Sequence, residues 1–166
     1  MNIFQKTLMQ IKINYKEITI LRKERIESVI KNVLTCSKKE LKLDRKNFEV
    51  SILITSRKYM TKLNSKYRNI NKETNVLSFP QNIAHGKYKN KTQLLGDIVI
   101  CIRKIKEEAK IYSRTFEDHL SHIVLHGFLH LLGYNHEDKS DAIIMEKKEK
   151  KILSKFSISD PYLIKN

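Results

Sequence analysis

The sequence predicts an α+β fold, a single domain in which a mixed β-sheet of about four strands packs against helices. Its 166 residues, 40% hydrophobic and 31% charged, are typical of one globular domain with an ordinary core. Strand-like segments are interleaved with helical ones. One helical segment is apolar almost all round, which indicates a buried central helix. We therefore expect a single domain over residues 1–166, without internal repeats.

Four segments have the composition of strands. Residues 9–15 alternate polar with apolar side chains, and residues 48–55 are rich in β-branched side chains. Residues 76–79 predict a short strand that Pro80 ends. Residues 96–102 are apolar enough for a central strand, and the polar residues 81–93 before them are expected to form a loop.

Five segments predict helices. Apolar positions recur at helical spacing from about residue 19 to 36, and Ser56 can cap a short helix that runs to residue 67. A charged helix is expected from about residue 103 to 112, and an amphipathic surface helix from about 139 to 156. Between these two, Thr115 can cap the apolar central helix, with Asp118 three residues later.

The central helix carries its polar side chains in one line of four histidines, His119, His122, His126 and His130. His126 and His130 are separated by four residues, so one face of the helix presents both imidazoles. Gly133 is suited to end the helix in a left-handed turn that brings His136 back toward them. Three imidazoles with an open fourth position describe a catalytic zinc site. His122, four residues before His126, is the competing third ligand.

The same spacing of three histidines and a glycine occurs in zinc proteases, with one difference. Those enzymes place a glutamate, their general base, directly after the first histidine. Here that position is Gly127. Peptide hydrolysis by the usual route is therefore disfavoured, although a zinc metalloprotease-like hydrolase remains the alternative enzyme. A zinc ion can also polarise a phosphoryl oxygen, which suits phosphodiester cleavage.

The charge of the chain points to a polyanionic partner. Its formal net charge is +15, and nucleic acid is the usual partner of so basic a protein. A genome rich in A and T would account for some of the lysines. Within the polar residues 63–80, Arg68 offers a bidentate fork for a phosphate group; the alternative is a surface salt bridge. Asp97, at the start of a strand, is a candidate proton acceptor.

Cellular location can be predicted from the cysteines and the hydropathy. Cys36 and Cys101 lie far apart in apolar surroundings, which favours reduced, buried thiols. The first 15 residues lack the apolar core of a signal peptide, and no segment is long enough to span a membrane. We therefore expect a cytoplasmic protein with no membrane partner. His85 lies in a polar segment and is given no role.

The segment His-Gly-Phe-Leu-His-Leu-Leu-Gly-Tyr-Asn-His, residues 126–136, resembles the signature of the YbeY family of bacterial rRNA maturation factors, which are single-strand-specific metallo-endoribonucleases. Asn135 stands where the family usually has aspartate. Further segments resemble the family's other motifs in the same order: Asn64, Tyr67-Arg68, residues 74–80 and residues 95–100. The resemblance covers roughly residues 50–140.

This resemblance implies one zinc ion on His126, His130 and His136, with Arg68 beside the metal on the RNA phosphate. The catalytic residues that we expect are Arg68 and His126. The resemblance also implies processing of single-stranded rRNA, especially maturation of the 16S rRNA 3′ end, and a role in ribosome biogenesis and quality control. The partners implied are the small ribosomal subunit, a ribosomal protein and a ribosome-assembly GTPase. A non-catalytic ribosome-assembly factor with a structural metal is the alternative of another class.

Overall fold

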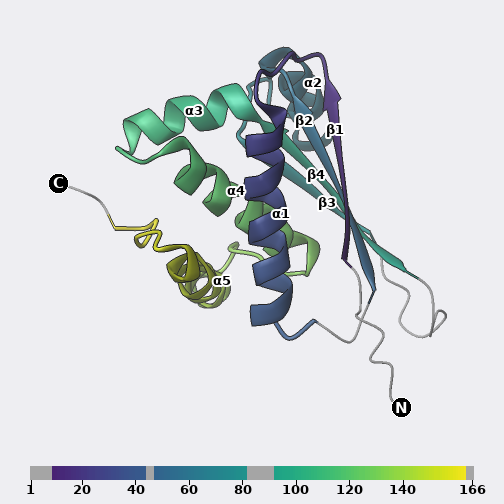
Figure 1. Cartoon of the computed structure of the whole chain (residues 1–166). Coiled ribbons are helices and arrows are strands. Elements are labelled where there is room, and N and C mark those ends of the chain that lie inside the picture. The colour runs from purple at the N-terminus through teal and green to yellow at the C-terminus, as the bar shows by residue number, and fades with distance from the viewer. Residues whose placement is uncertain (1–8, 44–46, 82–91, 164–166) are drawn as a thin grey trace.

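The computed structural model describes residues 9–43, 47–81 and 92–163, in which four strands form one mixed sheet (Figure 1). The sheet has the order β1-β2-β4-β3. Strand β2 pairs in parallel with β1 and with β4, whereas β3 runs antiparallel to β4 at one edge. The bounds are β1 Met9–Lys16, β2 Phe48–Thr55, β3 Val76–Pro80 and β4 Gln93–Cys101. The predicted α+β class and the central position of β4 are confirmed.

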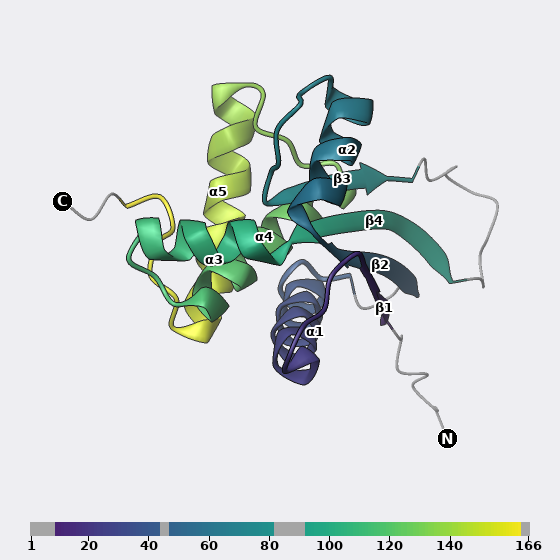
Figure 2. The ribbon, with the colours of Figure 1, turned by 90° about the horizontal axis from the view of Figure 1, so that it is seen from above.

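Helices cover both faces of this sheet, and the larger core lies on the face of α1 and α4. Figure 2 shows the strands between α1 and α2. Helix α2 packs on the opposite face over a smaller apolar cluster of Met60, Leu77, Val99 and Cys101. The helices are α1 Lys23–Glu40, α2 Arg57–Arg68, α3 Ile102–Ile111, α4 Phe116–Leu131 and α5 Lys139–Leu153, followed by the 3₁₀ turn η1 Ser154–Phe156.

Two predicted boundaries were wrong. Helix α1 begins at Lys23 rather than near residue 19, because Arg22 has left-handed backbone angles (φ 63°) that interrupt the helix there, and it continues to Glu40. Strand β4 begins at Gln93, within the predicted loop. The pairing of β4 with β2 shifts register after Leu94, which pairs with Glu49, so that Gly96 pairs with Val50. This bulge breaks the alternating pattern. Residues 82–91 of that predicted loop, and His85, lie outside the described residues.

Helix α4 lies at the centre of the fold, as its composition predicts. Thr115 caps it, accepting a hydrogen bond at 3.0 Å from the Asp118 N–H. Its apolar side chains are almost all buried among those of α1 and the sheet. The Ser78 hydroxyl on β3 donates a 3.1 Å hydrogen bond to the Gly127 carbonyl. These contacts fix the histidine-bearing helix against the edge strand β3.

The thiols of both cysteines are free; Cys101 is buried and Cys36 is partly buried. Burial raises the pKa of each thiol, which keeps both protonated and unreactive. Among the described helices, none has both the length and the apolar character that crossing a bilayer requires.

Candidate metal centre

The structure brings His126, His130 and His136 together. The ring nitrogens that they offer all lie within 4.8 Å of one another. The centroid of the His136 ring is 5.3 Å from that of His126 and 5.1 Å from that of His130. The Nε2 atoms of His126 and His130 are 3.1 Å apart. A tetrahedral zinc ion with bonds of 2.0–2.1 Å needs nitrogens about 3.3 Å apart, so this spacing suits such an ion.

The turn after α4 brings His136 close to His126 and His130, and it is the left-handed turn that Gly133 predicts. Gly133 has φ +89°, and its N–H bonds to the His130 carbonyl at 3.0 Å. The next N–H, of Tyr134, reaches the Leu129 carbonyl, also at 3.0 Å. This pair of bonds is a Schellman motif, which satisfies the last carbonyls of the helix and reverses the chain. Three residues after Gly133, the chain presents His136 to the helix end.

Hydrogen bonds at the far ring nitrogens orient His126 and His130. The Nδ1 of His126 lies 2.9 Å from Glu149 Oε1, and the Nδ1 of His130 lies 2.9 Å from the Tyr134 carbonyl oxygen. Both partners are acceptors, so each Nδ1 must carry the hydrogen. Each Nε2 then presents a lone pair toward the other. Two lone pairs at 3.1 Å repel unless a cation lies between them. The donor set therefore fits a bound metal ion.

The surroundings of His130 also favour the neutral imidazole that metal binding needs. Burial and the nearby His126 and His136 lower its pKa to about 4. The ring is therefore uncharged at neutral pH, and its lone pair is available.

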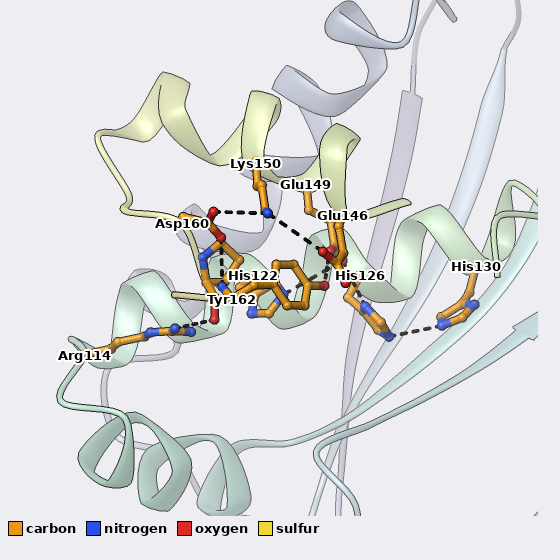
Figure 3. Close-up of polar contacts among 10 residues, drawn as sticks. Arg114, His122, His126, His130, Glu146, Glu149, Lys150, Asp160 and Tyr162 are labelled. Atoms are coloured by element: carbon orange, nitrogen blue, oxygen red, sulfur yellow. Dashed lines mark hydrogen bonds and ion pairs between the residues drawn. The ribbon is translucent and has the colours of Figure 1, made fainter. Parts of the chain in front are cut away.

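Glu149 is a site residue that the sequence interpretation missed. It lies on α5, which was predicted to be only an amphipathic surface helix, yet its side chain is completely buried. Figure 3 shows it close to His126, His122 and Tyr162. Burial alone would raise the pKa of Glu149, but the contacts with His122, His126 and Tyr162 lower it to about 2. Its place in the apolar stripe, four residues after Met145, was the signal available in the sequence.

Tyr162, in the segment after η1, closes this side of the centre. Its hydroxyl donates a hydrogen bond to Glu149 Oε2, and its ring packs edge-on against His122 with centroids 5.7 Å apart. Burial and Glu149 raise the pKa of Tyr162, so the hydroxyl keeps its proton. Two further contacts hold the segment, from Arg114 to the Pro161 carbonyl and from Lys150 to Asp160 at 3.1 Å (Figure 3).

His122, the competing third ligand, lies on the Glu149 side of His126. Its Nε2 is 3.9 Å from Glu149 Oε1, too long for a hydrogen bond. Neither ring nitrogen of this His has a hydrogen-bond partner. His122, His126 and Glu149 form a second group whose geometry could hold an ion. In that group the ion would need the Nδ1 of His126. This nitrogen already carries a hydrogen that it donates to the Glu149 carboxylate. The geometry therefore favours His136 as the third ligand.

His119 does not join the centre. It is 2% exposed, and its Nε2 lies 2.9 Å from Glu108 Oε2, which also accepts a 2.9 Å bond from the Asn75 amide. This network ties α4 to α3 and to the segment before β3. These contacts give His119 a structural role.

Asp97 lies on strand β4, and Arg68 is the last residue of helix α2. Asp97 lies two residues before Val99, on the face that α2 covers, whereas α4 covers the face of Ile98. This placement argues against Asp97 as a proton acceptor at the histidines.

The side chain of Arg68 is exposed at the end of α2, without a hydrogen bond or ion pair to other described residues. The adjacent Tyr67 packs on Phe79 of β3, with centroids 4.9 Å apart. Helices α2 and α4 therefore both border the edge strand β3.

The fold and the site together define an α+β protein whose central helix and following turn bring together three histidines that could hold a metal ion. The sequence profile of the family described as Endoribonuclease YbeY matches residues 10–157. This chain therefore belongs to the YbeY family.

Individual relatives agree with that assignment. The chain is 42% identical to an endoribonuclease YbeY of Bartonella quintana over 81% of this chain and 84% of the relative. It is 45% identical to that of Bartonella henselae, over 74% and 77%. It is 40% identical to that of Bradyrhizobium diazoefficiens, over 82% and 75%. The solution structure of a Thermotoga maritima protein is similar with a TM-score of 0.55 and 25% identity, covering 93% of this chain and 99% of that one.

Proposed function

We propose that this protein is a zinc-dependent endoribonuclease that cuts single-stranded RNA, with the ion held by His126, His130 and His136. The observation that carries the proposal is the pair of Nε2 atoms 3.1 Å apart, each on a ring whose Nδ1 bonds to an acceptor. The relatives named as endoribonucleases and the net charge of +15 support RNA as the substrate.

The chemistry is divided between the ion and the residues around it. A bound zinc ion would supply Lewis acidity, drawing charge from a phosphoryl oxygen and lowering the pKa of a water molecule. Arg68 binds a phosphate of the RNA through its guanidinium fork. Glu149 holds His126 in the tautomer that leaves Nε2 free. The proton acceptor is a group other than Asp97, which lies on the other face of the sheet.

The biological role follows from the family. We propose that the substrate is rRNA, especially the 3′ end of the 16S rRNA, and that the protein acts in ribosome biogenesis and quality control in the cytoplasm. Its partners would be the small ribosomal subunit, a ribosomal protein and a ribosome-assembly GTPase.

Cleavage of a single-stranded oligonucleotide that spans the 16S rRNA 3′ end tests the enzymatic proposal. We expect the wild-type protein to cut it, and His130→Ala, Arg68→Ala or chelator treatment to reduce cutting to background. Arg103→Ala is the control, since Arg103 is also an exposed arginine but lies on α3. Undiminished cleavage in the variants and after chelation would contradict the proposal. Small-subunit binding without cleavage at full zinc loading would favour the non-catalytic assembly factor.

A further inference from the structure

A pocket of about 340 Å³ opens beside the metal centre. His126 and His136 are part of its lining, so a ligand in the pocket touches the same side chains that would hold the ion. The other lining residues come from α5 and the C-terminal segment. The six lining residues are His126, His136, Ala142, Met145, Glu146 and Tyr162.

Most of this lining suits a flat aromatic ligand. Met145, which is 2% exposed, contributes a polarisable side chain to the lining, and Ala142 contributes a small one. Tyr162 is 39% exposed and adds an aromatic side wall, which its hydroxyl contact with Glu149 and the Lys150–Asp160 ion pair hold in place. Bases of single-stranded RNA stack on aromatic side chains of this kind.

Glu146 gives the pocket its polar specificity. Its ion-pair partner Lys150 lies 3.8 Å away, and because both side chains are partly exposed this pair contributes little to stability. A carboxylate repels phosphate and accepts hydrogen bonds from N–H groups, so Glu146 suits the base of a nucleotide better than its phosphate. Guanine presents two adjacent N–H donors that match a carboxylate. Adenine and cytosine offer one amino group, and uracil offers one N–H between two carbonyls that a carboxylate repels.

From these observations we propose that the pocket is a nucleobase subsite in which Glu146 selects guanine over uracil. This inference rests on the proposed RNA-cleaving function, because it seats the base of a nucleotide whose phosphate lies at the metal centre. Glu146 is the specificity-determining residue, and Tyr162 and Met145 provide the stacking surface.

Nucleosides without phosphate test the subsite apart from catalysis. The chain has four methionines, so the methyl signals of the methionines can be followed by NMR while guanosine, adenosine, cytidine or uridine is added. We expect the Met145 signal to move, with guanosine binding at least about tenfold more tightly than uridine. Met60, a buried residue of α2 on the other face of the sheet, is the internal reference.

Glu146→Gln should reduce that ratio to near one, whereas Glu24→Gln, an exposed carboxylate on α1, should leave it unchanged. A Met145 signal that ignores all four nucleosides, or a guanosine preference that survives in Glu146→Gln, would overturn the subsite. The two proposals fail separately. If the protein cuts RNA but the Met145 signal does not respond to any nucleoside, the nuclease proposal stands and the subsite is contradicted. If the Met145 signal responds selectively to guanosine but the protein cuts no RNA, the subsite stands and the nuclease proposal is contradicted.

Discussion

At the scale of single residues, His126 is the point where three parts of the chain meet. Its Nε2 faces His130, and its Nδ1 bonds to the buried Glu149, which also accepts the hydroxyl of Tyr162. A carboxylate in this position fixes the ring and makes the free nitrogen a stronger donor to a metal. Glu149 thus acts on the centre through His126.

We expect Glu149→Gln to weaken zinc binding about 10- to 100-fold, because the amide keeps a hydrogen-bond acceptor but loses the negative charge. Competition with a chelating dye measures the affinity, and nitrogen NMR of the metal-free protein reports the His126 tautomer. Glu24→Gln is the control for a lost carboxylate. Equal zinc affinity in wild type and Glu149→Gln would mean that Glu149 has only a structural role.

Gly127 has a packing reason to lack a side chain. A Cβ at this position would lie 3.0 Å from Ile98 Cγ2, 3.1 Å from Ser78 Oγ and 3.3 Å from Val76 Cγ2. The position that carries the base in zinc proteases therefore faces the sheet in this protein. A carboxylate there would meet apolar side chains, which adds a structural reason to reject the protease alternative.

The substitution Gly127→Glu should lower the free energy of unfolding by about 3 kcal/mol or more, through crowding and a buried charge. Urea denaturation followed by circular dichroism measures this loss. Ser28→Glu, at an exposed position of α1, is the matched control and should change stability by less than about 0.5 kcal/mol. A Gly127→Glu variant as stable as the control would show that α4 can move away from the sheet.

The residues of the site differ in how far the sequence could predict them. The i, i+4 spacing of His126 and His130 and the glycine before His136 are local patterns, and local geometry brings those rings together. Glu149 reaches the site only because α5 packs against α4, and no local pattern specifies which helices become neighbours. The place of Glu149 in the stripe of Met145 and Ile152 indicated burial, but not the partner.

At the scale of elements, the turn after α4 converts a helix end into part of the site. Gly133 adopts φ +89°, and a Cβ there would meet no atom within 4 Å. A substitution at this position therefore tests backbone conformation without a steric clash. Left-handed backbone costs most side chains about 1–2 kcal/mol, and asparagine less.

We expect Gly133→Val to lower the free energy of unfolding by at least about 1 kcal/mol and to weaken zinc binding, since His136 loses its fixed approach. Gly133→Asn should be milder in both measurements, because asparagine tolerates the left-handed region. Denaturation curves and zinc titrations provide the two readouts. If valine and asparagine gave the same result, the backbone conformation of the turn would not matter for either property.

The junction of α3, α4 and the segment before β3 should respond to acid. Burial would raise the pKa of Glu108, but hydrogen bonds from His119 and Asn75 outweigh it and lower the pKa. A carboxylate with a lowered folded-state pKa contributes stability that is present above its unfolded value of 4.5 and is lost as the pH falls through the folded value.

The stability difference between wild type and Glu108→Gln should therefore be largest at neutral pH and shrink as the pH falls below about 4.5. Denaturant titrations over a series of pH values measure it. Glu107→Gln is the control, because Glu107 pairs with Arg57 on the surface, where an ion pair contributes little. A difference for Glu108→Gln that stays constant down to acid pH would contradict this account.

The sequence predicted the strands of the sheet but not their order or pairing. Patterns among neighbouring residues predicted all four strands: alternation for β1, β-branching for β2, a short run ended by Pro80 for β3 and an apolar run for β4. The order β1-β2-β4-β3 and the parallel pairing of β2 depend on crossovers and on burial against α1 and α4. The bulge before Gly96 breaks the alternation, so the sequence did not show that β4 begins at Gln93. At Gly96 itself a Cβ would lie 2.2 Å from the Phe79 carbonyl oxygen, which only glycine avoids.

At the scale of the whole molecule, part of the excess positive charge forms a stripe on α2. Lys58, Lys62 and Lys66 are exposed at successive turns, and none has an ion-pair partner among the described residues. The stripe leads toward Arg68 at the end of the same helix. Lysines so arranged can follow an RNA backbone and release its counterions on binding.

Replacing the three stripe lysines with glutamine should lower the slope of log affinity for single-stranded RNA against log salt by about 2. Fluorescence anisotropy over a range of salt concentrations measures the slope. The control replaces Lys12, Lys31 and Lys151, which pair with Glu49, Glu27 and Glu40. It removes the same net charge and should change the slope less. Equal changes would mean that RNA responds to total charge rather than to α2.

The opposed lone pairs of His126 and His130 also bear on how long a copy of the protein lasts in a cell. The hydrogen bonds at Nδ1 turn the two Nε2 atoms toward each other at 3.1 Å, so a zinc ion between them would remove the repulsion of their lone pairs. An ion at a hundred times its dissociation constant would stabilise the fold by about 2.7 kcal/mol. Copies made when zinc is scarce would unfold more often and meet proteases sooner. The abundance of the protein would then follow the zinc supply without any dedicated sensor.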